Sequence, residues 1–154
     1  MNEPTTNDEV LTADRARTPS AYGLGLLAGL GFAIAYGIAA EAIGLSWGLL
    51  AVGFFGGWII GGAVGYGAWS GSAHVRVTSL QVGAAAIAGA AWLLALVIAY
   101  VVSQSLIPQA TTGLLERVSL GGFFDYLGGT FDYVRLIHVL AFALLAIMAW
   151  RGAR

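Results

Sequence analysis

The sequence predicts an all-α, polytopic membrane protein in which four transmembrane helices form a bundle and both termini lie on the inner side of the membrane. Three observations lead to this fold class. The 154 residues are 58% hydrophobic and only 10% charged, whereas a soluble domain has about 25% charged residues. Four apolar segments each approach the roughly 20 residues that a helix needs to cross a bilayer. The chain has no lysine, and five of its seven arginines lie on one side of these segments.

The amino-terminal residues 1–20 precede the first apolar segment and are polar. Acidic residues come first and Arg15 and Arg17 follow, whereas a secretory signal places basic residues directly before a short apolar stretch. We therefore expect residues 1–20 to form a disordered cytoplasmic tail.

Residues 21–154 are predicted to form a four-helix transmembrane domain. Its spans are expected at about residues 21–43, 47–69, 82–102 and 133–150. Only three residues separate the first two spans, which predicts a tight antiparallel hairpin. Trp47 and Trp69 are about 33 Å apart along a helix, so one of them is expected at each membrane surface.

Arginine placement predicts the orientation of the chain. With the amino terminus inside, five arginines lie on the inner side and two on the outer side, as the positive-inside rule requires. The inner ones are Arg15, Arg17, Arg76, Arg151 and Arg154, and the outer ones are Arg117 and Arg135. The expected location is the cell (inner) membrane, crossed several times.

The long outer connection, residues 103–132, has an unusual composition for a loop. It combines aromatic and aliphatic side chains with charged ones and contains the glycine pairs 121–122 and 128–129. This pattern predicts one or two short amphipathic helices at the membrane surface, broken at the two glycine pairs. A plain solvated loop is the alternative.

Glycines recur at every fourth position of the second predicted span. They are Gly53, Gly57, Gly61 and Gly65, and the first span repeats the spacing with Gly25 and Gly29. A step of four residues advances about 400° around a helix, so the four glycines form one bare strip. In lipid, helices approach one another closely across such small residues.

The strip has three interpretations. Packing within one chain is favoured, with the second span at the centre of the bundle and the first or third span against the strip. A seam with a second copy or another membrane protein is the next. A pore is least favoured, because the span has no acidic, basic or amide residue and a pore needs a polar lining.

One group of polar residues is expected near the outer surface. It comprises Glu41, Asp125, Asp132, Arg135 and His138. A structural network that seats the outer loop is the favoured interpretation, because ion-pair networks are often purely structural. Binding of a headgroup, a quinone or a small polar ligand is the alternative, and catalysis is the third.

Several kinds of function are not expected from the residues present. The chain has no cysteine and only two histidines, which the predicted topology places on opposite sides, so neither a metal site nor another cofactor is predicted. The net charge of −1 argues against nucleic-acid binding. No catalytic motif is present, and no catalytic residue is predicted.

Two stretches carry a resemblance to known proteins. The stretch EAIGLSWGLLAVGFFGGWIIGGAVGYGA resembles the helical hairpin of small multi-pass bacterial membrane proteins of uncharacterised function. The ending FDYVRLIHVLAFALLAIMAWRGAR resembles their last helix. The resemblance implies a four-helix membrane fold without catalytic residues. This chain departs from that pattern in its long acidic tail and its lack of lysine.

The function expected from these features is that of a non-catalytic accessory or scaffold subunit. Its small-residue helix faces would pack against a second copy or the subunits of a larger membrane complex, surrounded by membrane lipids. The alternative is a small transporter or channel with an outer polar vestibule formed by Glu41, Asp132, Arg135 and His138. An enzyme acting on lipid or quinone is a third interpretation.

Overall fold

The computed structural model describes residues 18–42, 47–69, 77–107, 113, 117–129 and 134–153. Within these ranges every regular element is an α-helix and no strand is present. The helices are α2 (Thr18–Ala42), α3 (Gly48–Trp69), α4 (Thr78–Ser105), α6 (Leu120–Gly129) and α7 (Val134–Gly152). The all-α class predicted from the sequence is confirmed.

Three of these helices are long and apolar enough to cross a membrane, namely α2, α3 and α4. The apolar part of α7 whose side chains are described, Ile137–Gly152, is shorter. Large aliphatic and aromatic side chains cover the outside of the long helices, as expected of a membrane protein whose helices face lipid. The helices begin and end within four residues of the predicted spans, because the length of each apolar run sets the length of its helix.

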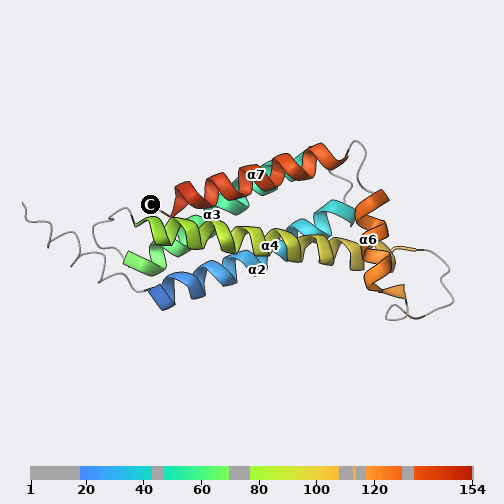
Figure 1. Cartoon of the computed structure of the whole chain (residues 1–154), viewed down its shortest axis with the longest axis horizontal. Helices are drawn as coiled ribbons and strands as arrows, with labels where there is room; N and C mark the ends of the chain where they lie inside the picture. Colours follow the sequence, from blue (N-terminus) through green and yellow to red (C-terminus); the bar gives the residue numbers. More distant parts are fainter. Residues whose placement is uncertain are drawn as a thin grey trace, which may run out of the picture.

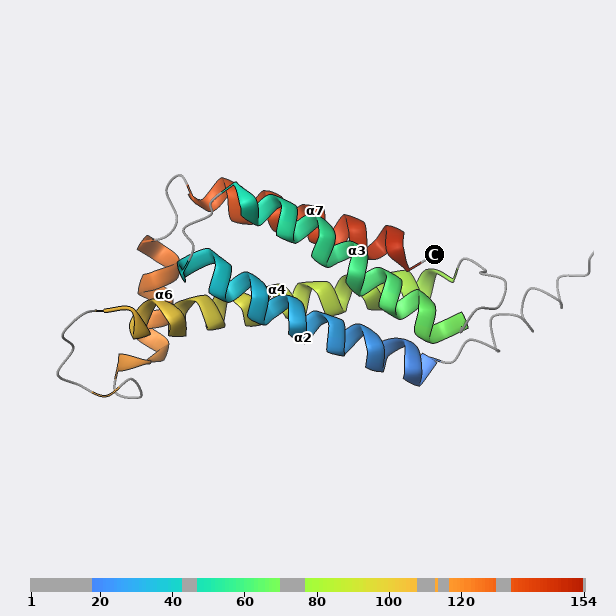
Figure 2. The ribbon, with the colours of Figure 1, turned by 180° about the vertical axis from the view of Figure 1, so that it is seen from behind.

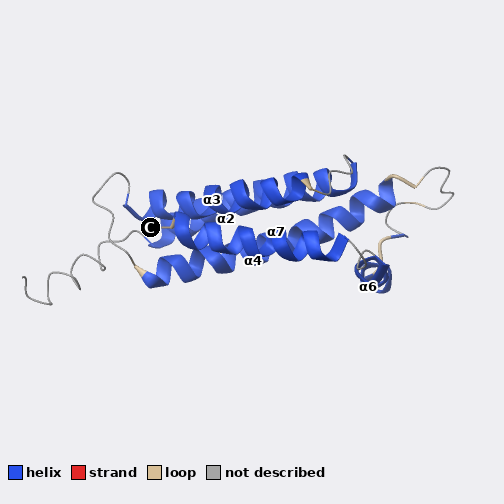
Figure 3. Cartoon of the chain, turned by 90° about the horizontal axis from the view of Figure 1, so that it is seen from above, coloured by secondary structure: helices blue, strands red, loops and turns tan. Residues whose placement is uncertain are grey.

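The four long helices lie side by side and α6 lies across one end of them (Figures 1 and 3). Contacts along the helices show that α2 and α4 run parallel to each other and antiparallel to α3 and α7 (Figure 2). Around the bundle, α2 contacts α3, α3 contacts α7, α7 contacts α4, and α4 contacts α2. We refer to the end at which α6 lies as the α6 end.

The inner face of α4 is built from small residues. Its buried alanines recur at three- or four-residue intervals and are Ala84, Ala88, Ala91, Ala95 and Ala99. Such side chains allow the neighbouring backbones to approach closely, which is the main source of attraction between helices in lipid. They also leave room in the core for the aromatic rings of the other helices.

The glycine strip of α3 lies against the backbone of α7. A Cβ atom at Gly53 would lie 2.6 Å from the carbonyl oxygen of Ala141, and Cβ atoms at Gly57 and Gly61 would collide with the carbonyl oxygens of Leu145 and Ala149. Both series advance by four residues, so the two parallel helices keep one register over about two turns.

This contact corrects the expected arrangement around the second span. The strip packs within the chain on the fourth apolar segment, and not on the first or third, and α3 occupies one corner of a four-sided bundle instead of its centre. Gly65, the last member of the strip, is buried.

The glycines of α2 face two different helices. A Cβ at Gly25 would lie 2.5 Å from Val64 on α3, and one at Gly29 would lie 3.2 Å from Ile87 and 3.3 Å from Ala91 on α4. The two glycines therefore lie where α2 meets both of its neighbours.

Two local features differ from expectation. Trp69 is only 6% exposed, so it belongs to the core and does not face lipid as a surface anchor would. The helix α6 continues through Gly121 and Gly122, where a break was expected, and ends at Gly128 and Gly129. The hydroxyl of Tyr100 lies against Gly122, so a glycine there allows α6 to pack closely on α4.

The contact between α3 and α7 can be tested with alanine. Gly57→Ala places a methyl group against the Leu145 carbonyl and should lower the free energy of unfolding by about 1–3 kcal/mol, because the two backbones must separate. Denaturant unfolding in detergent, followed by circular dichroism, measures this loss.

Gly62→Ala is the matched control, since it lies on the same helix and its Cβ would meet no atom within 4 Å. Its stability should be unchanged or slightly higher, because alanine favours the helix over glycine. Equal losses in the two variants would mean that the strip does not hold α3 against α7.

Candidate functional site

A pair of polar side chains lies inside the bundle near the α6 end. Tyr36 on α2 is 0% exposed and His138 on α7 is 8% exposed. The Tyr36 hydroxyl and the His138 Nδ1 atom are 2.8 Å apart, which is a hydrogen bond between residues 102 positions apart in the chain. Because a buried polar group without a partner is costly, this pair fixes α2 and α7 relative to each other.

Trp92 of α4 lies beside this pair. Its Nε1 atom is buried and makes no hydrogen bond with the described residues, and it acts electrostatically on the Tyr36 hydroxyl. The indole ring packs on Phe142 of α7 with a centroid distance of 4.9 Å. Three helices therefore bring hydrogen-bonding side chains to one point of an otherwise apolar core.

Glu41 lies in the last turn of α2, nearer the α6 end than Tyr36. The hydroxyl of Tyr126 on α6 donates a hydrogen bond to the Glu41 Oε1 atom. The charge of Glu41 also acts on His138 across the bundle, without an ion pair between these two described residues. The Glu41 carboxylate therefore attaches the crossing helix α6 to the end of α2.

Tyr100 of α4 contacts α6 and the residues that precede it. Its hydroxyl donates to the carbonyl oxygen of Arg117 at 3.2 Å and accepts from the Ser119 backbone N–H at 3.3 Å. Its ring packs against Phe123 and Tyr126, with centroid distances of 5.7 and 5.6 Å. The helix α6 is thus held by one aromatic side chain of α4 and one carboxylate of α2.

Arg117 forms a hydrogen bond with the last turn of α4. Its Nη1 atom donates to the carbonyl oxygen of Gln104 at 2.5 Å. Carbonyl groups in the last turn of a helix lack partners within it, and a cation there also interacts favourably with the helix dipole. We infer that Arg117 has a structural role.

The residues of the predicted polar cluster are only partly brought together. Glu41 acts on His138 through its charge alone, and Asp125 is exposed on α6. Asp132 lies outside the described residues, and Arg135 lies in α7 but its side chain is not described. Among the residues whose placement is described, no three His, Cys, Asp or Glu side chains are grouped as a metal site requires.

The tyrosines of this site were missed by reasoning from the sequence. Tyr36, Tyr100 and Tyr126 supply most of its hydrogen bonds, yet in an apolar stretch a tyrosine counts as a hydrophobic residue. The available signal was the hydroxyl of Tyr36, about 15 residues into a membrane-length apolar run, because such a group needs a partner in the core.

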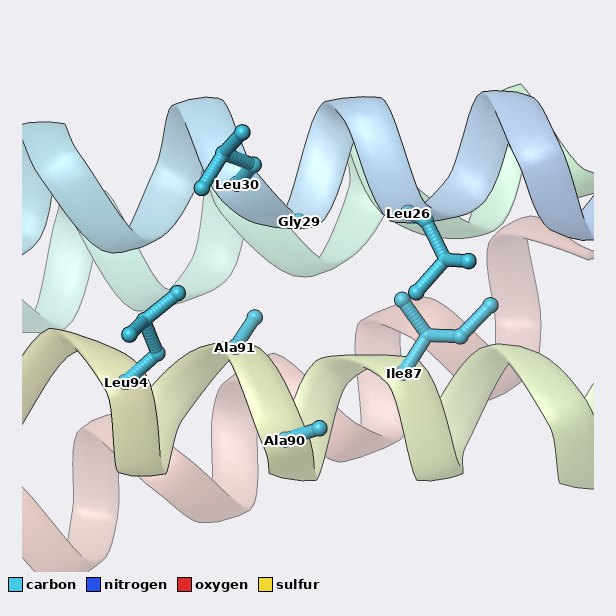
Figure 4. Close-up of a pocket in the computed structure, with 7 residues that line it drawn as sticks. All are labelled: Leu26, Gly29, Leu30, Ile87, Ala90, Ala91 and Leu94. Carbon is cyan, nitrogen blue, oxygen red and sulfur yellow. The ribbon is translucent and has the colours of Figure 1, made fainter.

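Two apolar grooves run along the outside of the bundle. The first, of about 200 Å³, lies between α2 and α4, where Leu26 and Ile87 point toward one another (Figure 4). The second, of about 530 Å³, lies between α2 and α3. It is lined by Ala28, Gly31, Phe32, Ala35, Ala51, Val52, Phe55, Gly56 and Ile59. Neither groove is lined by Glu41 or His138.

Comparison of the chain with protein-family models, curated proteins and solved structures gives no match.

The buried pair can be tested by removing its hydroxyl. Tyr36→Phe should lower the free energy of unfolding by about 1–3 kcal/mol, because it leaves a buried imidazole nitrogen without its partner. Tyr66→Phe is the control, since Tyr66 is 68% exposed and should show almost no change.

A double-mutant cycle separates the hydrogen bond from packing. The double variant replaces both Tyr36 and His138 with phenylalanine. Its loss of unfolding free energy should be smaller than the sum of the losses in the two single variants, because no unpaired polar group is left buried. Additive losses would mean that the two side chains do not depend on each other.

Proposed function

We propose that this protein is a non-catalytic accessory or scaffold subunit that packs against another membrane-spanning helix through the groove between α2 and α3. This groove is the observation that carries the proposal. It is apolar, has a volume of about 530 Å³, and runs between two helices that are long and apolar enough to cross a membrane.

The floor of the groove favours a helix as its occupant. Gly31 and Ala35 are one turn apart on α2, and both are exposed. A Cβ at Gly31 would meet no atom within 4 Å. Small residues at this spacing allow a second backbone to approach, which is how helices associate in lipid. The small-residue face proposed for a partner is therefore on α2, since the strip on α3 already faces α7.

We further propose that α7 is a fourth span and that both termini lie on the inner side. The 19 residues of α7 extend about 28 Å at ~1.5 Å per residue, close to the ~30 Å of the hydrocarbon core. The distribution of arginines supports this orientation, and the α6 end would then be the outer end.

A small transporter or channel is the second candidate function. The buried His138 and the half-buried Glu41 favour it, because ionisable residues within membrane segments often mark ion or substrate pathways. It ranks second because the groove that carries the scaffold proposal is lined by other residues. Ion or proton flux through proteoliposomes that contain the purified protein would establish it.

The scaffold proposal predicts that the protein keeps a partner or a second copy in mild detergent. Gly31→Leu should abolish this association and leave the thermal stability of the chain unchanged, because the new side chain fills the open groove. Light scattering after gel filtration, and mass spectrometry of co-purified proteins, measure the association.

Gly23→Leu is the matched control. Gly23 lies on the same helix, a Cβ there would also meet no atom within 4 Å, and it does not line the groove. This variant should associate as the unmodified protein does. A wild-type protein that is strictly monomeric and retains no other subunit would contradict the scaffold proposal.

The orientation predicts a difference between two single-cysteine variants. The chain has no cysteine, and Thr78 and Asp125 are exposed at opposite ends of the bundle. An impermeant thiol reagent should label Asp125→Cys on intact cells and should label Thr78→Cys only after permeabilisation. Labelling of Thr78→Cys alone on intact cells would mean that the orientation is the opposite one. Equal labelling of both variants would mean that the two positions lie on the same side of the membrane, which contradicts a single crossing by α4.

A further inference from the structure

One side of the crossing helix α6 packs on the long helices. The ring of Tyr100 on α4 packs against Phe123 and Tyr126, and its hydroxyl lies against Gly122. The Tyr126 hydroxyl also donates a hydrogen bond to Glu41 at the end of α2. At about 100° per residue, Gly122, Phe123 and Tyr126 fall within one sector of roughly 100° around the helix. This sector faces the bundle.

The rest of α6 divides into an apolar side and a polar side. Leu120 and Phe124 are one turn apart and are 81% and 66% exposed. Asp125 is exposed as well, and it lies about 100° around the helix from Phe124 and about 140° from Leu120. The helix therefore has three sides, of which one faces the bundle, one is apolar and one is charged.

Tyr100 sets the level of α6 along the bundle. It lies five positions before Ser105, the last residue of α4, so α4 continues for about 8 Å beyond the contact. The next two residues, Leu106 and Ile107, are exposed and apolar. The helix α6 therefore crosses beside the end of a helix that can span a membrane, at a level where this helix still has apolar surface ahead of it (Figures 1 and 3).

Exposed aromatic side chains on α3 mark two levels along the bundle. Trp47 is exposed at the α6 end, one residue before α3 begins, and Tyr66 is exposed near the other end of α3. The 19 positions from Trp47 to Tyr66 extend about 28 Å, close to the ~30 Å of the hydrocarbon core. Trp and Tyr are enriched at the two surfaces of a membrane. The α6 end thus has the position of a membrane surface.

We propose that α6 is a membrane-surface helix whose side chains Leu120 and Phe124 insert among the acyl chains of the lipid leaflet at the α6 end, while Asp125 faces water. An interfacial helix buries its apolar face about 5–10 Å into this boundary, which agrees with the level that Tyr100 sets. Because Tyr100 and Tyr126 join α6 to α4 and α2, its insertion fixes the depth of both helices in the membrane. The proposal is independent of the scaffold function.

The size of the apolar side favours lipid over protein as its occupant. A stable protein interface uses about 20–30 residues from each partner, whereas this side exposes Leu120 and Phe124. Acyl chains need no such area, because they already surround the exposed apolar side chains of the long helices at this level. The partner of this surface is therefore the hydrocarbon of the bilayer.

Single spin labels on α6 test the proposal in the full-length protein in phosphatidylcholine vesicles. The chain has no cysteine, so each variant carries one label. Oxygen concentrates in hydrocarbon and a nickel chelate stays in water. The ratio of oxygen to nickel collisions should be several-fold higher for Leu120→Cys and Phe124→Cys than for Asp125→Cys, their matched control on the same helix.

Two positions on α4 calibrate this ratio. Val97→Cys is the reference for lipid, since Val97 is exposed within the helix. Thr78→Cys is the reference for water, since Thr78 is exposed at the end of the helix farthest from α6. The labels at Leu120 and Phe124 should resemble the first reference, and the label at Asp125 should resemble the second.

Two results would overturn the proposal. A ratio at Leu120→Cys no higher than at Asp125→Cys would mean that the apolar side faces water, and low collision rates with both reagents would mean that protein covers it. Phe124 packs on Phe123, so if Phe124→Cys does not fold, Leu120→Cys decides the outcome alone. None of these results bears on association through Gly31, so the scaffold function is tested separately.

Discussion

The close approach of the α3 and α7 backbones is the contact on which the rest of this bundle depends. Side chains cannot enter this contact, because Cβ atoms at Gly53, Gly57 and Gly61 would meet carbonyl groups of α7. Close contact of this kind brings Cα–H groups against carbonyl oxygens and maximises van der Waals attraction, which matters more in lipid than in water. The matching four-residue steps also fix the register of α7, which places His138 in the core three residues before Ala141.

The polar core follows from this register. With α7 held against α3, His138 lies diagonally across the bundle from α2 and meets the hydroxyl of Tyr36. The small alanine face of α4 leaves room for the rings of Tyr36 and Trp92 between the helices. A shift of α7 by one residue would rotate His138 by about 100° around its helix and leave two buried polar groups without partners. Packing of small residues thus determines where hydrogen bonds form.

The sequence predicts where the helices begin and end better than it predicts which helices pack against each other. Span limits depend on local apolar length, and α2, Thr18–Ala42, differs from its expected start by three residues. The strip of glycines indicates a close approach but not its partner, because glycine or alanine occurs in every apolar segment. The pairing of Tyr36 with His138 joins residues 102 positions apart and depends on the register of a third helix. Of the predicted polar cluster, Glu41 and His138 lie near the same end of the bundle, because α2 ends where α7 begins.

The groove and the polar core are physically connected through Phe32. Its ring lines the groove between α2 and α3 and packs on Tyr36 with a centroid distance of 5.4 Å, and Tyr36 in turn holds His138. Contact alone does not couple two sites, because coupling requires an element with two arrangements that both sites influence. A helix seated in the groove would act on the polar core only by moving Phe32, since neither Tyr36 nor His138 lines the groove.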